Sequence, residues 1–156
     1  MARRPYVSTY FSPNRGAADV VIGFIDRCSS TIDAAVYSVT HDGIAAALIR
    51  AHHRGVRVRL LMDKAQAGSK YADDEHIAAA GVPVRRDTQS GLMHTKYMVG
   101  DGKAVASGSF NWTKGADMRN VETFNIMRLS YVVKDFAAHF KAIWADNEAG
   151  AVTPTP

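Results

Sequence analysis

Strand-like and helix-like segments alternate along the chain up to Arg86, and this alternation constrains the fold more than any other feature. Short runs rich in β-branched and apolar residues predict strands at 6–12, 32–39, 56–62 and 82–86. Apolar residues at helical spacing predict helices between them, at 20–28, from Thr40 or Asp42 to Gly55, and at 69–80. Alternation of this kind is typical of α/β proteins, in which helices cover a sheet.

The following part of the chain carries the pattern expected of antiparallel strands. Strands predicted at 94–100 and 103–109 flank Asp101-Gly102, a dipeptide that favours a two-residue type I′ turn. The other elements predicted in this half are a strand and an apolar-striped helix, at 120–129 and 130–147. The stripe consists of Val133, Phe136, Ala137, Phe140, Ile143 and Trp144. We therefore expect an α/β fold, a mixed β-sheet sandwiched between helices, with one polar hairpin.

Polar side chains of this hairpin converge if its Asp-Gly dipeptide forms a two-residue turn. The facing pairs are then His94 with Ser109 and Lys96 with Ser107. Because side chains alternate between the two faces of a strand, these four residues and Asn111 share one face. The group holds an imidazole, an ammonium, two hydroxyls and an amide, without a carboxylate. Such a set is suited to binding an oxyanion.

The chemistry of this set favours phosphoryl transfer over two alternatives. Lysine is not a metal ligand at neutral pH, and His94 has no second ligand at metal-binding spacing, so we expect neither a metal nor a cofactor. The chain has no GxSxG turn, so serine-hydrolase chemistry fits poorly. His94 is better suited to attack phosphorus as a nucleophile. The residues expected to hold the non-bridging oxygens are Lys96, Ser109 and Asn111.

The segment from His94 to Asn111 resembles the HxKxxxxDxxxxxxGSxN motif of the phospholipase D superfamily. Every fixed position is present at the spacing of the motif: His94, Lys96, Asp101, Gly108, Ser109 and Asn111. The opening Tyr10-Phe11-Ser12-Pro13 and the Arg54-Gly55-Val56-Arg57-Val58 turn are also similar to members with a single motif. The resemblance implies the fold of that superfamily and an activity like that of its small bacterial endonucleases.

The resemblance further implies a two-step hydrolysis through a phosphohistidine. One histidine attacks, and a second one, from another copy of the motif, protonates the leaving oxygen and later activates water. This chain has one copy, and the histidines outside it are His41, His52, His53, His76 and His139. A homodimer is therefore expected, with a composite site built from two copies of His94.

Two acidic residues receive different expectations. The resemblance implies a carboxylate that fixes the catalytic imidazole through its second ring nitrogen, and Glu122 is the candidate. The residues alone leave a water-facing edge-strand glutamate as an equal alternative at this position. Asp101 belongs to the motif but lies at the tip of the hairpin, so a structural role is expected for it and for Gly108.

The intact motif favours a metal-independent phosphodiesterase, and within that class a non-specific endonuclease acting on DNA or RNA. Lys and Arg number 19 against 15 Asp and Glu, and a net charge of +4 permits a polyanionic partner without requiring one. The basic residues that form either a groove or a solvated face are Arg54, Arg57, Arg59, Lys64, Lys70, Arg85, Arg86, Lys114 and Arg119. Phe110 and Trp112 flank the motif, and we expect core packing rather than base stacking from both.

Two other functions stay open. The first uses the same chemistry, as a phospholipase D acting on phospholipid or cardiolipin headgroups, although no amphipathic membrane-binding helix is evident. The second belongs to another class, a nucleic-acid-binding module without turnover. The intact motif argues against this module, because binding alone does not need the whole catalytic set.

The chain has 156 residues, of which 47% are hydrophobic, which is sufficient for one domain with its own core. We expect a single catalytic domain over 1–149 and a flexible tail over 150–156. No apolar run approaches the roughly 18–20 residues of a membrane span, so no membrane insertion is expected. The basic start resembles that of a signal peptide, but no apolar stretch follows it. The compartment is left open, because a lone Cys28 fits both reducing and oxidising surroundings.

Overall fold

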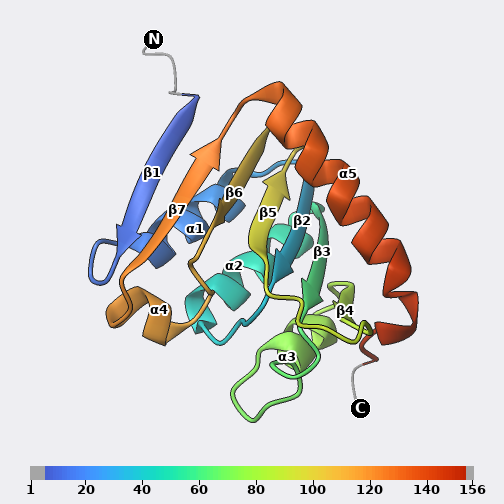
Figure 1. Ribbon diagram of the computed structural model, residues 1–156. Helices are drawn as coiled ribbons and strands as arrows, with labels where there is room; N and C mark the ends of the chain where they lie inside the picture. Colours follow the sequence, from blue (N-terminus) through green and yellow to red (C-terminus); the bar gives the residue numbers. More distant parts are fainter. Residues whose placement is uncertain (1–5, 154–156) are drawn as a thin grey trace.

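A computed structural model describes residues 6–153 and contains one seven-stranded mixed sheet with helices on both faces (Figure 1). The strands are β1 (Val7–Ser12), β2 (Thr31–Val36), β3 (Arg57–Met62), β4 (Val84–Arg86), β5 (Lys96–Gly100), β6 (Ala104–Gly108) and β7 (Glu122–Met127). The helices are α1 (Ala17–Arg27), α2 (Asp42–His53), α3 (Asp74–Ala79), α4 (Lys114–Met118) and α5 (Ser130–Asp146). The predicted α/β sandwich is confirmed. The basic start of the chain and the last three residues of the predicted tail lie outside the described residues.

The sheet joins a parallel half to an antiparallel half in the order β1-β7-β6-β5-β2-β3-β4. Strands β2, β3 and β4 are parallel neighbours, whereas β5, β6, β7 and β1 pair antiparallel in series from β2 outward. The first strand therefore does not join the parallel half that follows it in the sequence. It pairs instead with β7 at the far edge of the sheet.

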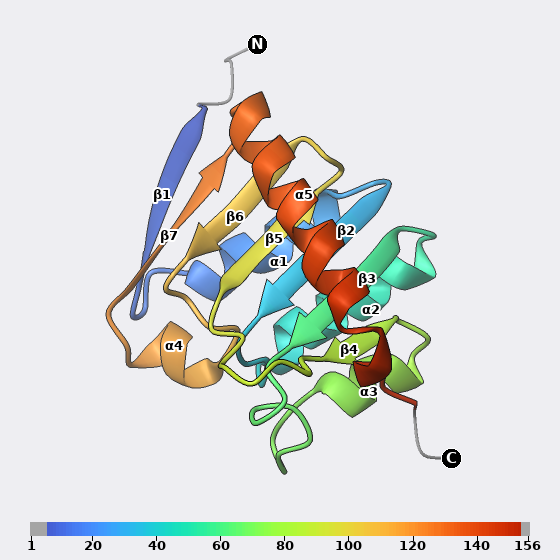
Figure 2. The same ribbon diagram turned by 45° about the vertical axis from the view of Figure 1, so that its right-hand side comes forward.

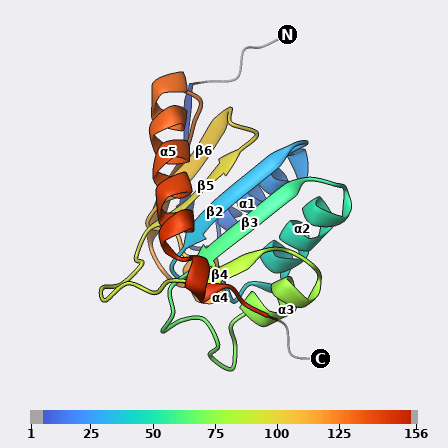
Figure 3. The same ribbon diagram turned by 90° about the vertical axis from the view of Figure 1, so that its right-hand side faces the viewer.

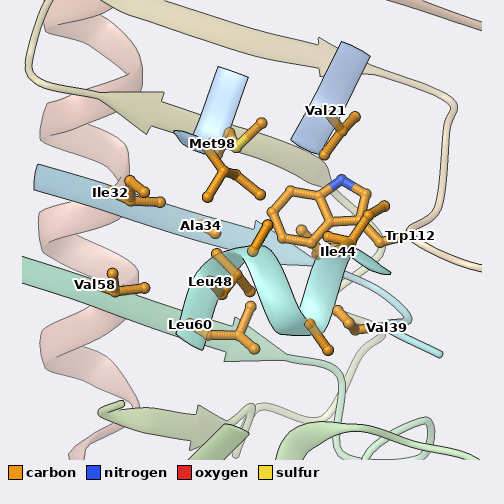
Figure 4. Close-up of a cluster of buried hydrophobic side chains, with 14 of the residues drawn as sticks. Val21, Ile32, Ala34, Val39, Ile44, Leu48, Val58, Leu60, Met98 and Trp112 are labelled. Atoms are coloured by element: carbon orange, nitrogen blue, oxygen red, sulfur yellow. The ribbon is translucent and has the colours of Figure 1, made fainter. Parts of the chain in front are cut away.

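Each face of the sheet has its own apolar core (Figure 3). Helices α1 and α2 cover one face, where Ile44, Leu48 and Trp112 pack against the sheet (Figure 4). Helix α5 covers the other face through the predicted stripe, of which Val133 and Phe140 are fully buried. The prediction for this helix is confirmed to within one residue.

Several element ends differ from the prediction. Strand β2 ends at Val36 instead of residue 39, and β5 begins at Lys96, so His94 lies outside the strand. Helix α2 has His41 at its N-cap and no side-chain cap, instead of a cap by Thr40 or Asp42. Helix α4 was not predicted, because five residues are too few to show helical periodicity.

The predicted register of the polar hairpin is wrong by one residue. Asp101 and Gly102 have the positive φ values of a type I′ turn, 53° and 60°, and the Lys103 amide donates to the Gly100 carbonyl at 2.9 Å. Gly100 nevertheless pairs with Ala104, so one residue is added to the connection. The observed register differs from the predicted one where β5 also pairs with β2. The β2–β5 ladder continues past Gly100, through a bond from the Asp101 amide to the Thr31 carbonyl at 2.8 Å.

As a consequence Tyr97, and not Lys96, lies across from Ser107. We had expected Ser107 and Lys96 to share a face. They do not, because neighbouring strand residues point to opposite faces and Ser107 lies across from Tyr97. A one-residue change of register moves every side chain of one strand to the other face relative to its partner.

The carboxylate of Asp101 holds the hairpin to the start of β2. It accepts hydrogen bonds from the backbone amides of Ser29 at 3.0 Å, Ser30 at 2.8 Å and Thr31 at 2.9 Å. Partial burial raises the pKa of Asp101, but these hydrogen bonds, together with one from the Ser30 hydroxyl, outweigh that effect and hold the pKa well below its usual range. The charged form is therefore strongly favoured in the folded protein.

The beginning of the predicted flexible tail is ordered in the structure. Ala151 forms an antiparallel bridge with Arg85, and the Val152 amide donates to the Val84 carbonyl at 2.9 Å. Val152 also packs against the core on the α1 and α2 face. Residues 150–152 therefore lie along the free edge of β4.

Replacing Asp101 by Asn is expected to lower the free energy of unfolding at pH 7 by about 1–3 kcal/mol, because an amide cannot accept all of these bonds. The depressed pKa means that the wild-type advantage is present above the unfolded-state pKa of about 3.9 and is lost as the pH falls toward the lower folded-state pKa. Urea titrations at pH 7 and pH 3 measure both effects. Asp135→Asn on the exposed surface of α5 is the control, and equal midpoints for Asp101→Asn and wild type at pH 7 contradict the prediction.

Substituting Gly108 by Ala is expected to destabilise the fold by about 1–3 kcal/mol through overpacking. A Cβ atom at this position lies 2.1 Å from the Thr123 carbonyl oxygen and 2.5 Å from the Phe124 Cα, both of which belong to the backbone of β7. Thermal unfolding measures the loss. The matched control is Gly91→Ala, where the added Cβ meets nothing within 4 Å. Equal melting temperatures for the two variants would show that the β6–β7 contact adapts.

Candidate active site

The predicted catalytic and phosphate-binding residues lie at or next to one end of the sheet, where β2, β3 and β6 end and β5 and β7 begin; Asp101 lies at the other end of the hairpin. Figure 2 shows these strand ends side by side. His94 precedes β5 by two residues, Ser109 follows β6 directly, and Glu122 is the first residue of β7. The carboxyl end of the parallel strands is where open α/β sheets bind ligands. The topology therefore places the polar motif at the edge best suited to a site.

The pairing of β5 with β2 stops at this end of the sheet. Beyond it, the segment that follows β6 pairs with the segment that follows β2. The last bond of the β2–β5 ladder runs from the Tyr37 amide to the Thr95 carbonyl at 3.0 Å. Beyond it, the Trp112 amide donates to the Ser38 carbonyl at 3.1 Å, and the Thr40 amide to the Trp112 carbonyl at 2.9 Å. These bonds between Trp112 and the segment after β2 bring Asn111 to the same end of the sheet as His94.

The aromatic residues on either side of Asn111 are buried. Phe110 and Trp112 belong to the core under α1 and α2, so the prediction of core packing for both is confirmed. The Oδ1 atom of Asn111 is itself buried and has no hydrogen-bond partner within residues 6–153. The amide side chain is therefore held by packing of its neighbours and keeps an unused acceptor.

His94 is exposed, and its ring lies against Tyr37, with ring centroids 4.6 Å apart. The Tyr37 hydroxyl accepts a hydrogen bond from Gln66 Nε2 at 3.1 Å. Buried Asp63 anchors the preceding loop, because its Oδ2 accepts from the Met93 amide at 3.0 Å. Sequence analysis missed these residues, although a carboxylate directly after an apolar strand was a signal for Asp63.

Lys96 is buried, with 8% of its surface exposed, which is unusual for a lysine. Its ammonium donates to the His94 carbonyl and lies 5.0 Å from the centre of the Tyr37 ring. Burial lowers the pKa of Lys96, and the negative charge of Glu122 opposes this effect. The ammonium is thus a poorly solvated cation beside the candidate nucleophile, and an anion bound there would compensate it.

Ser109 and Glu122 form the second part of the site. The Ser109 hydroxyl donates to Oε2 of Glu122 and accepts from the Thr123 amide at 3.1 Å. The side-chain Nδ2 of Asn120 donates to the other carboxylate oxygen, Oε1, at 3.1 Å. Within the described chain, the hydrogen bonds of Glu122 go to these two side chains and not to His94. The expected bond between Glu122 and the catalytic imidazole is not formed inside one subunit.

His94 and Lys96 line different cavities. His94 lines a cavity of about 340 Å³ together with His139, whereas Lys96 lines a separate space of about 10 Å³ with Gly108. A wider groove of about 660 Å³ begins at Ser38 and Gln66, beside the Tyr37 ring that contacts His94. A single chain therefore presents an open half-site rather than a closed pocket.

The basic residues do not form one continuous surface. Those in ion pairs elsewhere on the fold are Arg54 with Asp26, Arg57 and Arg59 with Asp33, and Arg86 with Asp74. Three others line the wide groove: Lys70, Lys114 and Arg119. Of these three, Lys114 is paired with Asp42, so Lys70 and Arg119 are the groove cations without an ion pair in the described chain.

Between residues 6 and 153, no three His, Cys, Asp or Glu side chains gather in a way that could hold a metal ion. Over the same residues, no helix combines the length and apolar character required to span a membrane.

Comparison with known proteins places this arrangement in a family. Residues 21–144 match the family described as cardiolipin synthase, phospholipase D-like domain. A mitochondrial cardiolipin hydrolase of Chlamydomonas reinhardtii is 31% identical over 123 residues, which are 79% of this chain and 55% of the relative. A phospholipase D of Rickettsia felis is 33% identical over 146 residues, which are 94% of this chain and 71% of the relative. The chain thus spans about half of the first relative and less than three quarters of the second.

A solved structure resembles the whole fold. Nuc from Salmonella typhimurium, a phospholipase D family member, superposes with a TM-score of 0.86 at 28% identity. The match covers 96% of this chain and 98% of Nuc. The family match extends over the motif, both halves of the sheet and most of α5. The chain therefore belongs to the phospholipase D superfamily.

Proposed function

We propose that this protein is a metal-independent phosphodiesterase that cleaves nucleic acid as an endonuclease of low sequence preference. The observation that carries the proposal is the exposed imidazole of His94 beside the buried ammonium of Lys96. An exposed imidazole can reach phosphorus, and a poorly solvated cation stabilises the negative charge that builds on the phosphoryl oxygens. The side-chain NH2 group of Asn111 is proposed to donate a further hydrogen bond to those oxygens, and Ser109 donates another when its hydroxyl proton turns away from Glu122.

The proposed reaction has two steps. In the first, a ring nitrogen of His94 forms a bond to phosphorus while the bond from phosphorus to the leaving oxygen breaks, and a second imidazolium gives that oxygen a proton. In the second, water attacks the phosphohistidine and loses a proton to the same second imidazole. The phosphorus–nitrogen bond then breaks, and both histidines return to their starting states.

The second imidazole is proposed to be His94 of another copy of the chain. His94 and Glu122 lie on the open end of the sheet, so a second copy docked there would close the site about a two-fold axis. In such a dimer the carboxylate of Glu122 is proposed to orient an imidazole, in addition to its bonds with Ser109 and Asn120. His139 is a rival within one chain because it lines the same cavity as His94.

Nucleic acid is favoured over lipid by two features. The net charge is +4, and three cations line the groove beside the site: Lys70 and Arg119, which form no ion pair in the described chain, and Lys114, which is paired with Asp42. The domain also matches Nuc over almost the full length of both chains. A lipid phosphodiester is the second candidate substrate, because the relatives named cardiolipin hydrolase and phospholipase D are 31% and 33% identical.

Replacing His94 by Ala is expected to abolish cleavage of plasmid and single-stranded DNA, with a loss of about a thousandfold or more, because no other group can form the covalent intermediate. Cleavage by the wild type is expected to persist in excess EDTA. Gel assays with DNA, RNA and cardiolipin vesicles measure the activity. The matched control is His53→Ala, an exposed histidine at the end of α2.

Three outcomes would contradict the proposed function. Loss of cleavage in EDTA would contradict the metal-independent mechanism. Turnover of vesicles that depends on His94, with no cut in any nucleic acid, would assign the lipid function. Binding of DNA that depends on salt, without product at any protein concentration, would assign the non-catalytic module.

A heterodimer of one wild-type and one His94→Ala subunit is expected to lose activity by about a hundredfold or more, because a composite site needs both imidazoles. Co-expression with two different affinity tags yields this species, and its turnover is compared with that of doubly tagged wild type. Retention of about half the activity would show that one chain supplies both groups. In that case His139→Ala, made in the wild-type dimer, becomes the variant to measure.

A further inference from the structure

An open groove of about 660 Å³ is lined by residues of the loop that follows β3 and of helix α4. Figure 2 shows this loop and α4 at the end of the sheet that carries the half-site. We call it the α4 groove and define it by Ser38, Gln66, Lys70, Tyr71, Lys114 and Arg119. Its remaining lining residues are Thr40, Asp42, Ser69, Ala72, Asp73 and Gly115. The proposed reaction uses none of these side chains.

Two contacts connect the α4 groove to His94. Gln66 donates to the hydroxyl of Tyr37, whose ring contacts His94. Ser38 accepts a backbone bond from Trp112, the residue after Asn111. These contacts place the lining of the groove next to Tyr37 and Asn111, at the same end of the sheet as His94.

Tyr71 is the most prominent aromatic side chain of the groove, with 74% of its surface exposed. Its ring lies 5.6 Å from the ammonium of Lys70, which forms no ion pair in the described chain. Arg119, from the end of α4, also has no ion pair among the residues described. An exposed ring in a groove that also holds two cations without an ion pair has the composition of a surface that binds single-stranded nucleic acid.

The acidic residues of the groove oppose this charge only in part. Asp42 pairs with Lys114 at 2.6 Å, so these two charges compensate one another. Asp73 is partly buried, and its Oδ2 has no hydrogen-bond partner within the described chain. Burial, together with the charge of Asp42, raises the pKa of Asp73. The cations at Lys70 and Arg119 are therefore the dominant charges that a ligand meets.

We propose that the α4 groove binds an unpaired strand of the substrate, with Tyr71 stacking on one base and with Lys70 and Arg119 contacting phosphates on either side of it. This inference rests on the proposed nuclease function and deepens it. A base can stack on Tyr71 only when it is free of its duplex neighbours. The groove therefore makes the enzyme selective for single strands over duplex DNA of the same sequence.

Binding is measured by fluorescence anisotropy with the His94→Ala protein, which binds without cleaving, and with an oligonucleotide or its duplex. Adding Tyr71→Ala is expected to weaken single-strand binding about 5- to 100-fold and to change duplex binding much less. Tyr71→Phe keeps the ring and is expected to restore single-strand binding. The matched control is Tyr131→Ala, an exposed tyrosine on α5.

Kinetics provide a readout that a misfolded variant would not reproduce. We compare kcat/KM for the single-stranded oligonucleotide with kcat/KM for bis(4-nitrophenyl) phosphate, a diester too small to fill the groove. The ratio of the two is expected to fall at least about fivefold in Tyr71→Ala, through KM for the oligonucleotide. An equal loss on both substrates would overturn the proposal.

Failure of this inference is distinguishable from failure of the proposed function. If the wild type cleaves nucleic acid and Tyr71→Ala binds single strands as tightly as the wild type, the groove assignment alone is overturned. If the wild type hydrolyses the small diester and lipid vesicles but neither binds nor cleaves any nucleic acid, both are overturned. If Tyr71→Ala weakens single-strand and duplex binding equally, the groove assignment is overturned, because the surface would then act only through its charge.

Discussion

The hydrogen bonds between Asp101 and the backbone of residues 29–31 fix the position of the hairpin relative to β2. Every later strand of the antiparallel half is placed in turn, since β6 pairs with β5, β7 with β6 and β1 with β7. The carboxylate lies at the opposite end of the hairpin from His94. Asp101 therefore acts on the site indirectly. Its hydrogen bonds fix the register of β5 against β2, and this register decides where β5 begins and where the imidazole of His94 is exposed.

The candidate site depends on a cation that water cannot easily reach. Lys96 is covered by protein and has the His94 carbonyl and the Tyr37 ring as its neighbours. Both carry partial negative charge, but neither neutralises an ammonium, and Glu122 acts on it only through space. A phosphodiester would complete this arrangement by bringing the missing charge. The open half-site and the unused acceptor of Asn111 fit a site that is finished by its substrate and by a second subunit.

Much of the fold was predictable because its signals are local. Apolar runs located the strands, and the stripe on α5 located a helix that packs as expected. The spacing of the motif predicted His94, Lys96 and Ser109 as site residues, and this stays a prediction. The hairpin register was not predictable, because it depends on a contact between Asp101 and residues 70 positions earlier. Tyr37 and Gln66 were missed for the same reason, since their proximity to His94 arises only when the strand ends meet.

The segment at 150–152 has a consequence for association between copies. A sheet has two edges, and an unpaired edge strand is a template for another chain. Here Ala151 and Val152 occupy the outer side of β4, so that edge already has its partner. Among residues 6–153, strand β1 is the edge without a further partner strand, with Val7 and Phe11 exposed on it. Any growth of the sheet by strand addition is thereby directed to one side of the molecule, away from β4.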